Sequence, residues 1–456
     1  RGGYYPIVYD AKLKQKHKTK AGVEDLFENN LFKPNVSSGF MESRTEFYDP
    51  IKLSLSVLGT HLNEVVHFIT HYEAVRNANK IITDDAFALA FKEHFGHAHY
   101  NGLRPWLKNI ANDGRPTEQS PFSFMANHMR IGLSMTSMAF NMGTAIMQGF
   151  GMFTTIDEIG MKNTLHGMKV TLLGGPSAWK FAIDKSGELR HILKQADREI
   201  ADTVDEMFRT SKFGRGWNSM KQFAFWHIAQ AQRVVNIASW YGAYDQAIGN
   251  GLSDKDAANK ADAVVRMTQS GAGLKDLAAV QRGGEGAKLF TAFYTYFSVL
   301  FNRERNAVRE LRTGKAMQFA WSMMWLVMAP VYFEAMLRNK EPEDDESGAA
   351  WFAKEAAAYS VTSIPVVGAA ISAVVSPYPF RASPAAEGFS KAANTLLNLA
   401  DKDFEDMTEY QTKSAIEAIG TLFHIPTKPI TRFNTMMGED DPEDIARAFL
   451  FGQRSE

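Results

Sequence analysis

Two long apolar stretches, residues 316–337 and 356–375, lie on either side of a short acidic loop in this chain. The loop, residues 341–346, contains five acidic residues, whereas the second stretch has no charged residue and the first has only Glu334. A helix needs about 20 mostly apolar residues to cross a bilayer, so each stretch is long enough. The pattern predicts a helical hairpin that contacts a membrane. The alternative for the first stretch is a core helix with an aromatic face, and the second stretch is rich in alanine, which makes it a weak membrane inserter.

The composition limits the classes of function that the chain can have. The chain of 456 residues is only 45% hydrophobic, has a formal net charge of -1 and contains no cysteine. The absence of cysteine excludes disulfides, thiolate metal sites and cysteine nucleophiles. A near-zero net charge gives no global attraction to nucleic acid or to anionic lipid. A chain of soluble composition with a membrane-length hairpin is a candidate for a protein that enters a membrane late.

Helical periodicity dominates the chain after residue 50. Ser253, followed by Asp254 and Asp256, is typical of a helix start, and Asn250-Gly251 just before it indicates a turn. We therefore expect an all-α, multi-helix bundle. Apolar residues recur three and four positions apart over residues 51–80, 83–96, 120–153, 187–212, 216–249, 253–269, 284–312, 315–338, 384–400 and 408–424.

A third uncharged run extends over residues 131–156. It contains five methionines, and small residues recur four apart at Ala139/Gly143 and Ala145/Gly149, a spacing that lets helix backbones approach closely. Serine, threonine, asparagine and glutamine dilute its hydrophobicity. The run is consistent either with a buried pair of helices in a soluble fold or with a membrane segment.

The side chains that we expect to meet lipid come from both stretches of the hairpin. Aromatic side chains near both ends of the first stretch are typical of bilayer interfaces, and Pro330 and Pro365 should interrupt their helices. Basic residues flank the hairpin, which places the acidic loop away from the cytoplasm. The expected lipid contacts are Phe319, Trp321, Trp325, Leu326, Tyr332, Ile364, Val367 and Ile371.

A lysine cluster near the start of the chain is a second candidate contact. It consists of Lys12, Lys14, Lys16, Lys18 and Lys20. Such a cluster can contact a phosphate backbone or anionic lipid head groups, or it can be a solvated arm without a partner.

Motifs for catalysis and metal binding are weak. Glu64/His67 and Glu188/His191 match the Glu-x-x-His element of di-iron bundles, but the spacing also arises by accident in a chain with 12 histidines. Gly283-Gly284 opens a glycine-rich stretch without the Gly-Lys-Ser/Thr ending of a phosphate loop. No nucleophile motif occurs. We expect no catalytic residue, no metal site and no cofactor, and hence a chain that is not an enzyme.

One stretch resembles a known class of proteins. Thr268-Gln269-Ser270-Gly271, followed by Gln281-Arg282-Gly283, leads into Phe290-Thr291 and on to Asn302-Arg303. This sequence resembles helical domains of the large polyvalent proteins of tailed bacteriophages, which include internal virion and DNA-ejection proteins. The opening residues 1–6 and the segment 42–50 are similar to those chains too. The sharp part of the resemblance covers residues 266–306.

The resemblance implies a role in genome delivery. Such proteins are packed in the virion interior and expelled into the host cell envelope, the periplasm or membrane, where they help to form a conduit for DNA. It implies other phage ejection proteins, host membrane lipid and phage DNA as partners, and a conduit implies a homo-oligomer, as a cyclic ring. The alternatives are a scaffold that never inserts, and a helical accessory region of a giant virion enzyme such as an RNA polymerase. The missing initiator methionine predicts a piece of a longer polypeptide.

The sequence also predicts how the chain is divided. We expect an irregular N-terminal arm over residues 1–50, a helical domain over 51–250, a long-helix region with the phage-like motif over 251–345, and an apolar hairpin arm with C-terminal helices over 346–456.

Overall fold

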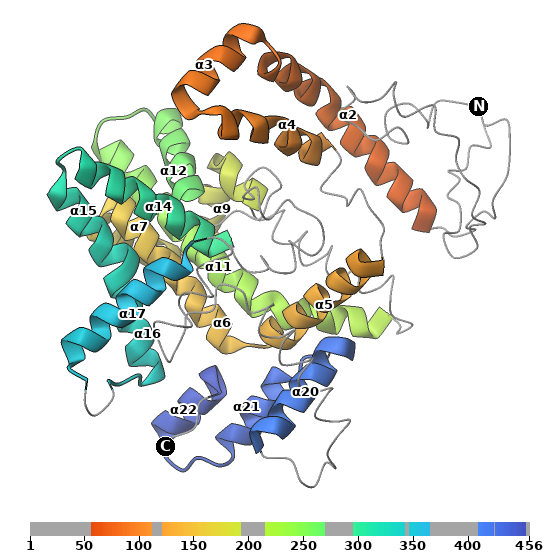
Figure 1. Ribbon diagram of the computed structural model, residues 1–456, viewed down its shortest axis with the longest axis vertical. Helices are drawn as coiled ribbons and strands as arrows, with labels where there is room; N and C mark the ends of the chain where they lie inside the picture. Colours follow the sequence, from red (N-terminus) through yellow and green to blue (C-terminus); the bar gives the residue numbers. More distant parts are fainter. Residues whose placement is uncertain are drawn as a thin grey trace, which may run out of the picture. The chain divides into compact units, whose positions relative to one another are not determined.

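The computed structural model describes residues 56–111, 121–192, 215–269, 295–342, 346–364, 409–423 and 425–452. Every regular element in these ranges is a helix, and they contain no strand, which confirms the all-α prediction (Figure 1). The chain divides into two compact units, Arg1–Thr117 and Glu118–Glu456. The expected helix at residues 384–400 and the N-terminal arm lie outside the described ranges.

In the part of the first unit that the structure describes, residues 56–111, there are three helices, α2 (Ser56–Ile82), α3 (Asp85–Phe95) and α4 (His97–Ala111). Asp84 starts α3, because its side chain accepts a hydrogen bond of 3.0 Å from the backbone N–H of Phe87. Helices α2 and α4 pack through a small apolar core that includes Val75, Leu107 and Ala111. This unit is an ordinary amphipathic three-helix assembly.

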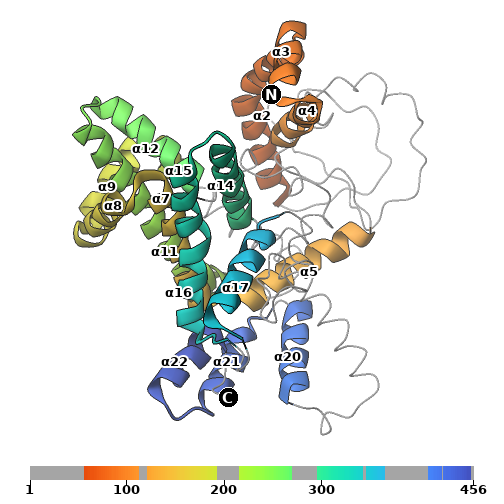
Figure 2. The same ribbon diagram turned by 60° about the vertical axis from the view of Figure 1, so that its left-hand side comes forward.

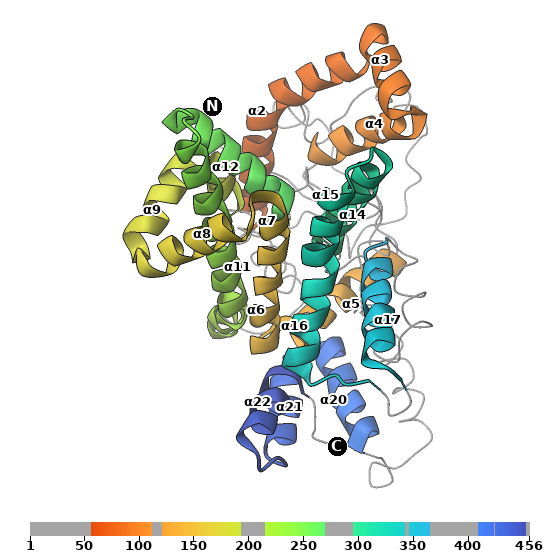
Figure 3. The ribbon, with the colours of Figure 1, turned by 90° about the vertical axis from the view of Figure 1, so that its left-hand side faces the viewer.

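The second unit is built around one long central helix (Figures 1 and 3). Its fully buried Trp240 donates a hydrogen bond of 2.9 Å to Asp262, a residue that also accepts from Ser186 at 2.5 Å. The described helices of this unit are α5 (Pro121–Met138), α6 (Met142–Met147), the 3-10 turn η2 (Gln148–Phe150), α7 (Gly151–Ile159), α8 (Met161–Leu173), α9 (Gly175–Lys185), the central α11 (Arg215–Gly249), α12 (Asp254–Thr268), α14 (Thr295–Arg312), α15 (Ala316–Met323), the π-helical turn η4 (Met324–Met328), α16 (Ala329–Arg338), α17 (Gly348–Thr362), α20 (Glu409–Phe423), α21 (Lys428–Met436) and α22 (Pro442–Phe451).

The helix start at Ser253 is confirmed. The Ser253 hydroxyl accepts a hydrogen bond of 3.2 Å from the backbone N–H of Asp256, and helix α12 begins at the next residue, Asp254. The preceding helix α11 ends at Gly249, and Gly251 adopts a φ of 86°, which only glycine takes easily. The turn residues therefore separate two packed helices as their sequence predicts.

The uncharged run 131–156 is divided among the end of α5 and the shorter elements α6, η2 and α7 instead of forming one long helix. Phe140 has a φ of 54° and Asn141 caps α6 by accepting from the N–H of Thr144 at 3.1 Å, so the chain changes direction there. A Cβ on Gly132 would lie 1.8 Å from the carbonyl oxygen of Thr421, which shows how closely α5 and α20 approach. The run packs against α11 and the C-terminal helices, as we expect for helices buried within the fold.

Candidate membrane-contact site

Helices α15 and α16 and the turn η4 between them form one continuous element, which we call the apolar rod (Figure 2). The rod, Ala316–Arg338, has 23 residues, and among the described residues it is the one helix long and apolar enough to cross a membrane. At 1.5 Å per residue it is about 35 Å long, which is enough for the roughly 30 Å hydrocarbon core of a bilayer.

The π-helical turn η4 lies just before Pro330. Proline has no N–H to donate, and its ring crowds the preceding helical turn. Widening that turn relieves the clash, and a π turn is a known response to such strain. The predicted interruption at Pro330 is therefore a local π turn, and the rod continues beyond it as α16.

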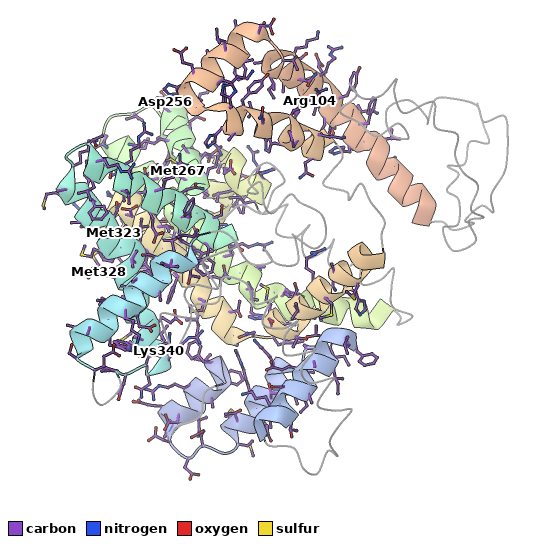
Figure 4. All side chains as sticks on the ribbon, viewed as in Figure 1. Arg104, Asp256, Met267, Met323, Met328 and Lys340 are labelled. Atoms are coloured by element: carbon purple, nitrogen blue, oxygen red, sulfur yellow. The ribbon has the colours of Figure 1, made fainter. Side chains whose placement is uncertain are left out.

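One face of the rod is apolar and open to solvent, and we call it the outer stripe. Its six members follow one another at spacings of three or four residues, which places them on one face of a helix. Only 28% of the most apolar 18-residue window of the rod is buried. The outer stripe consists of Met317, Trp321, Met324, Met328, Tyr332 and Met336, with exposed fractions from 39% to 85%. Figure 4 labels Met328 of the outer stripe and also Met323, which lies on the rod but belongs to the covered side.

The opposite face of the rod belongs to a core of its own. Leu326, Val327 and Val331 are at most 4% exposed and pack with Leu300 of α14 and Tyr359 of α17. In Figures 2 and 3, α17 runs beside the lower half of the rod. Both faces of the rod are thus apolar, but only the inner face is covered by other helices.

Polar side chains fasten the inner face of the rod to α7 and α14. Arg303 of α14 donates from Nε to Asp157 at 2.8 Å and from Nη2 to Glu158 at 2.9 Å. Ser322 of the rod donates to the other carboxylate oxygen of Asp157 at 2.7 Å. The side chains of Arg303 and Asp157 are only 12% and 6% exposed, so this pair is shielded from solvent.

A second buried group of charges lies at the end of the rod. Glu334, the one charged residue that the sequence places within the first apolar stretch, is 6% exposed. Its carboxylate lies 3.2 Å from Nε of Arg338 and 3.4 Å from Nζ of Lys340, and Lys340 also lies 3.8 Å from Glu355 of α17. Lys340 is labelled in Figure 4. These pairs connect the two arms of the hairpin.

A buried carboxyl group sits between α14 and α17. Glu304 accepts a hydrogen bond of 2.6 Å from the hydroxyl of Ser363. Burial raises the pKa of the Glu304 carboxyl to about 7, against the opposing effect of the hydrogen bonds from Ser363 and Ser360. Burial likewise raises the pKa of Tyr296 to about 12, while its hydroxyl lies 2.9 Å from that of Tyr359. The contact between α14 and α17 is therefore polar as well as apolar.

The predicted lipid contacts on the rod point in different directions. Trp321 and Tyr332 belong to the outer stripe, with exposed fractions of 39% and 59%. Phe319 and Trp325 are half-buried, and the ring of Trp325 stacks on Phe153 with centroids 6.4 Å apart. Leu326 is fully buried and faces the core, because it lies on the side of the helix opposite the outer stripe.

The second arm of the hairpin starts earlier than the apolar stretch. Ser347 caps α17 by accepting from the N–H of Ala350 at 3.2 Å, so the helix begins at Gly348, just after the acidic loop, and ends at Thr362, before Pro365. Ile364 is half-buried. Val367 and Ile371 lie outside the described residues, and so do the five lysines at positions 12, 14, 16, 18 and 20.

The phage-like motif contributes packing contacts where it is described. Thr268 and Gln269 are 2% and 5% exposed. The Gln269 amide donates to the carbonyl oxygen of Gly151 at 3.0 Å and to Thr155 at 2.9 Å, while Thr154 donates to the carbonyl oxygen of Thr268 at 2.7 Å. These bonds join the end of α12 to α7. Sequence reasoning missed this role, although two adjacent polar residues at a helix end are a usable signal.

The two Glu-x-x-His elements carry structural contacts. Glu188 accepts from Arg266 at 3.0 and 2.7 Å, and Nε2 of His67 lies 3.1 Å from the carbonyl oxygen of Ile110. Among the described residues, no group of three or more histidine, aspartate or glutamate side chains is placed to hold a metal ion.

A cavity of about 730 Å³ lies between α7, α12, α14 and α15. Its walls include Asp157 and Arg303, whose ion pair is described above, and also Met317 and Trp321, so the start of the outer stripe borders this cavity. Comparison of the chain with protein-family models, with curated proteins and with solved structures finds no match.

Proposed function

We propose that this chain is a non-enzymatic segment of a phage internal virion protein that helps to deliver the genome across the host envelope. In this proposal the chain starts in the virion interior and acts in the periplasm or membrane after ejection. Several copies assemble as a cyclic ring with other ejection proteins, and no cofactor takes part. The lysines at positions 12 to 20 contact phage DNA or lipid head groups.

The observation that supports a membrane role is the outer stripe. Soluble monomeric proteins rarely expose contiguous apolar surface of this kind without a binding partner. Met317, Met324, Met328 and Met336 give the stripe flexible side chains that adapt to irregular surroundings such as lipid chains. Trp321 and Tyr332 add rings that favour the membrane interface.

The polar contacts on the inner face of the rod limit how the rod can be oriented in a membrane. Crossing a bilayer as an isolated helix would separate Ser322 from Asp157 and Glu334 from Lys340. Breaking a buried ion pair by removing one partner costs about 3–5 kcal/mol, so that separation is expensive. The rod therefore lies in the interface, parallel to the membrane, with the outer stripe in the lipid and the inner face on its own core.

Flotation with lipid vesicles tests this proposal on the full chain. Replacing three members of the outer stripe, as Met324→Ser, Met328→Ser and Tyr332→Ser, should lower vesicle binding at least tenfold, because each change removes apolar surface from the contact. The control is Met267→Ser, since Met267 of α12 is 48% exposed, like Met328 at 47%. Equal binding of the triple variant and the wild type would contradict a lipid role for the rod.

A second candidate function is a scaffold in the capsid or host that never meets lipid. The observation that favours it is the same set of polar contacts on the inner face, which holds the rod to α7, α14 and α17. In that case the outer stripe contacts another protein. The wild type would then fail to float with vesicles, and the triple variant would change the mass of the assembly in sedimentation.

A further inference from the structure

A second exposed apolar feature lies at the turn between α8 and α9. Leu172 and Leu173, which we call the tip leucines, are 59% and 77% exposed. Met161 and Leu165 continue the same exposed surface along α8, at 46% and 52%. Four large apolar side chains thus face solvent on a helix of 13 residues. This surface does not include any part of the apolar rod.

The opposite face of α8 explains why these side chains point outward. Thr164, Gly167 and Thr171 are buried against α11 at spacings of three and four residues. A Cβ on Gly167 would lie 2.1 Å from the carbonyl oxygen of Ala238, so only glycine permits this approach. The small residues fix the orientation of α8, and the large apolar residues are left on the outer side.

A groove lies next to the tip leucines. It has a volume of about 560 Å³, within the range of roughly 300–1,000 Å³ that is typical of small-molecule pockets. Leu172, Pro176, Trp179 and Ile183 give it apolar walls. The indole N–H of Trp179 donates to the carbonyl oxygen of Thr171 at 3.0 Å, so its polar atom is already satisfied and its ring remains as an apolar surface.

Positive charge surrounds this apolar surface. Lys162, Lys169 and Lys180, which we call the rim lysines, are exposed, and Lys180 also lines the groove. Within the described part of the chain none of the three forms an ion pair, whereas Lys185 pairs with Asp254. Asp184 is the one acidic residue of α8 and α9. Exposed leucines with a basic rim match an anionic surface with an apolar interior.

A phospholipid bilayer meets both requirements, whereas a second copy of this chain would bring its own rim lysines against those of the first. We propose that the α8–α9 turn binds the surface of an anionic phospholipid bilayer. The tip leucines enter the acyl region, an acyl chain occupies the groove beside Trp179, and the rim lysines contact the phosphates. This inference rests on the proposed function in taking a membrane as partner, and it adds the lipid class and a second contact surface.

Vesicle flotation of the full chain with two lipid compositions tests the inference. Wild-type protein should bind vesicles that contain phosphatidylglycerol at least tenfold better than vesicles of phosphatidylcholine alone. Each lysine near an anionic surface strengthens binding by roughly fivefold. The triple variant of the rim lysines, Lys162→Glu, Lys169→Glu and Lys180→Glu, should therefore lose this preference. The matched control is Lys255→Glu with Lys260→Glu, two exposed lysines of α12.

The tip leucines are tested separately. Leu172→Ser with Leu173→Ser should weaken binding to both kinds of vesicle at least tenfold, and the thermal melt should remain unchanged because both side chains are exposed. Leu89→Ser in α3 is the control, as Leu89 is 71% exposed and lies in the other unit. Wild-type binding by the double leucine variant overturns the proposal. A changed sedimentation mass with unchanged flotation overturns it too, by assigning the turn to self-association.

The two membrane proposals fail in different ways. Substitutions in the outer stripe should reduce binding to neutral and anionic vesicles alike, whereas the triple variant of the rim lysines should affect anionic vesicles only. If substitutions in the outer stripe leave vesicle binding unchanged and those of the tip leucines reduce it, the rod proposal is wrong and the α8–α9 turn is the membrane contact. If the rim lysines have no effect on the lipid preference, the inference about lipid class is wrong even where the rod proposal holds.

Discussion

The run 131–156 and the apolar rod each contain five methionines and hardly any charge, but their side chains meet different surroundings. Met135 and Met152 of the run are 1% and 7% exposed, whereas Met317 and Met328 of the rod are 85% and 47% exposed. The run breaks at Phe140 and is covered by α11 and by the C-terminal helices. The rod continues past Pro330 and packs on one side only. One partner that covers the run, α20, comes from almost 300 residues away, so composition does not reveal which apolar segment is covered.

The largest effect should come from the ion pair between Arg303 of α14 and Asp157 of α7, the carboxylate that also accepts from Ser322 of the rod. Arg303→Ala leaves the carboxylate of Asp157 buried without its guanidinium, which should lower the free energy of unfolding by about 3–5 kcal/mol. Arg305→Ala is the control, because Arg305 lies on the same helix and is exposed. Denaturant unfolding measures both. A loss no larger than that of the control would show that the Arg303–Asp157 pair does not stabilise the packing of α14 on α7.

The next largest effect compares one residue type in the two segments. Met135→Ala removes a fully buried side chain and should cost about 2–5 kcal/mol, because a cavity remains. Met328→Ala removes a half-exposed side chain of the outer stripe and should change the free energy of unfolding by less than about 0.5 kcal/mol. Similar losses for the two variants, measured by urea unfolding, would mean that the outer face of the rod is covered in solution.

The sequence predicts the helices well because periodicity and end signals are local. Ser253 starts α12 as its capping pattern indicates, and α17 ends before Pro365. The start of α17 differs from the apolar stretch, since the cap at Ser347 and not hydrophobicity sets it. Local hydrophobic patterns therefore predict where helices lie, and capping residues determine where each helix begins.

The candidate site is harder to predict because its two faces are chemically alike. Trp321 and Leu326 are equally plausible lipid contacts in sequence, and only the packing of Leu326 against α14 and α17 separates them. The role of Gln269 depends likewise on bonds to Gly151 and Thr155, more than 100 residues away. Tertiary contacts of this range leave no periodic trace in a single sequence.

The smallest expected effect concerns the Glu304 carboxyl between α14 and α17. It tests whether the free energy of unfolding depends on pH through this buried contact. The pKa of Glu304 rises from its ordinary 4.5 to about 7 because of burial. Its ionised form is thus disfavoured in the fold, and stability that is fully present below about pH 4.5 is lost as the pH rises through 7. Glu304→Gln keeps an oxygen that can accept from Ser363 and removes the ionisation.

The variant should equal the wild type below about pH 4.5 and exceed it above pH 7, by about 3 kcal/mol at most, since one pKa unit corresponds to about 1.4 kcal/mol. Thermal unfolding at several pH values measures this difference, and groups common to both proteins cancel in it. Glu310→Gln on the same helix is the control, because Glu310 lies at the cavity wall beside solvent. A constant difference between wild type and Glu304→Gln from pH 4 to pH 8 would mean that Glu304 is solvated. The contact between α14 and α17 would then be open to water, like the outer stripe of the rod.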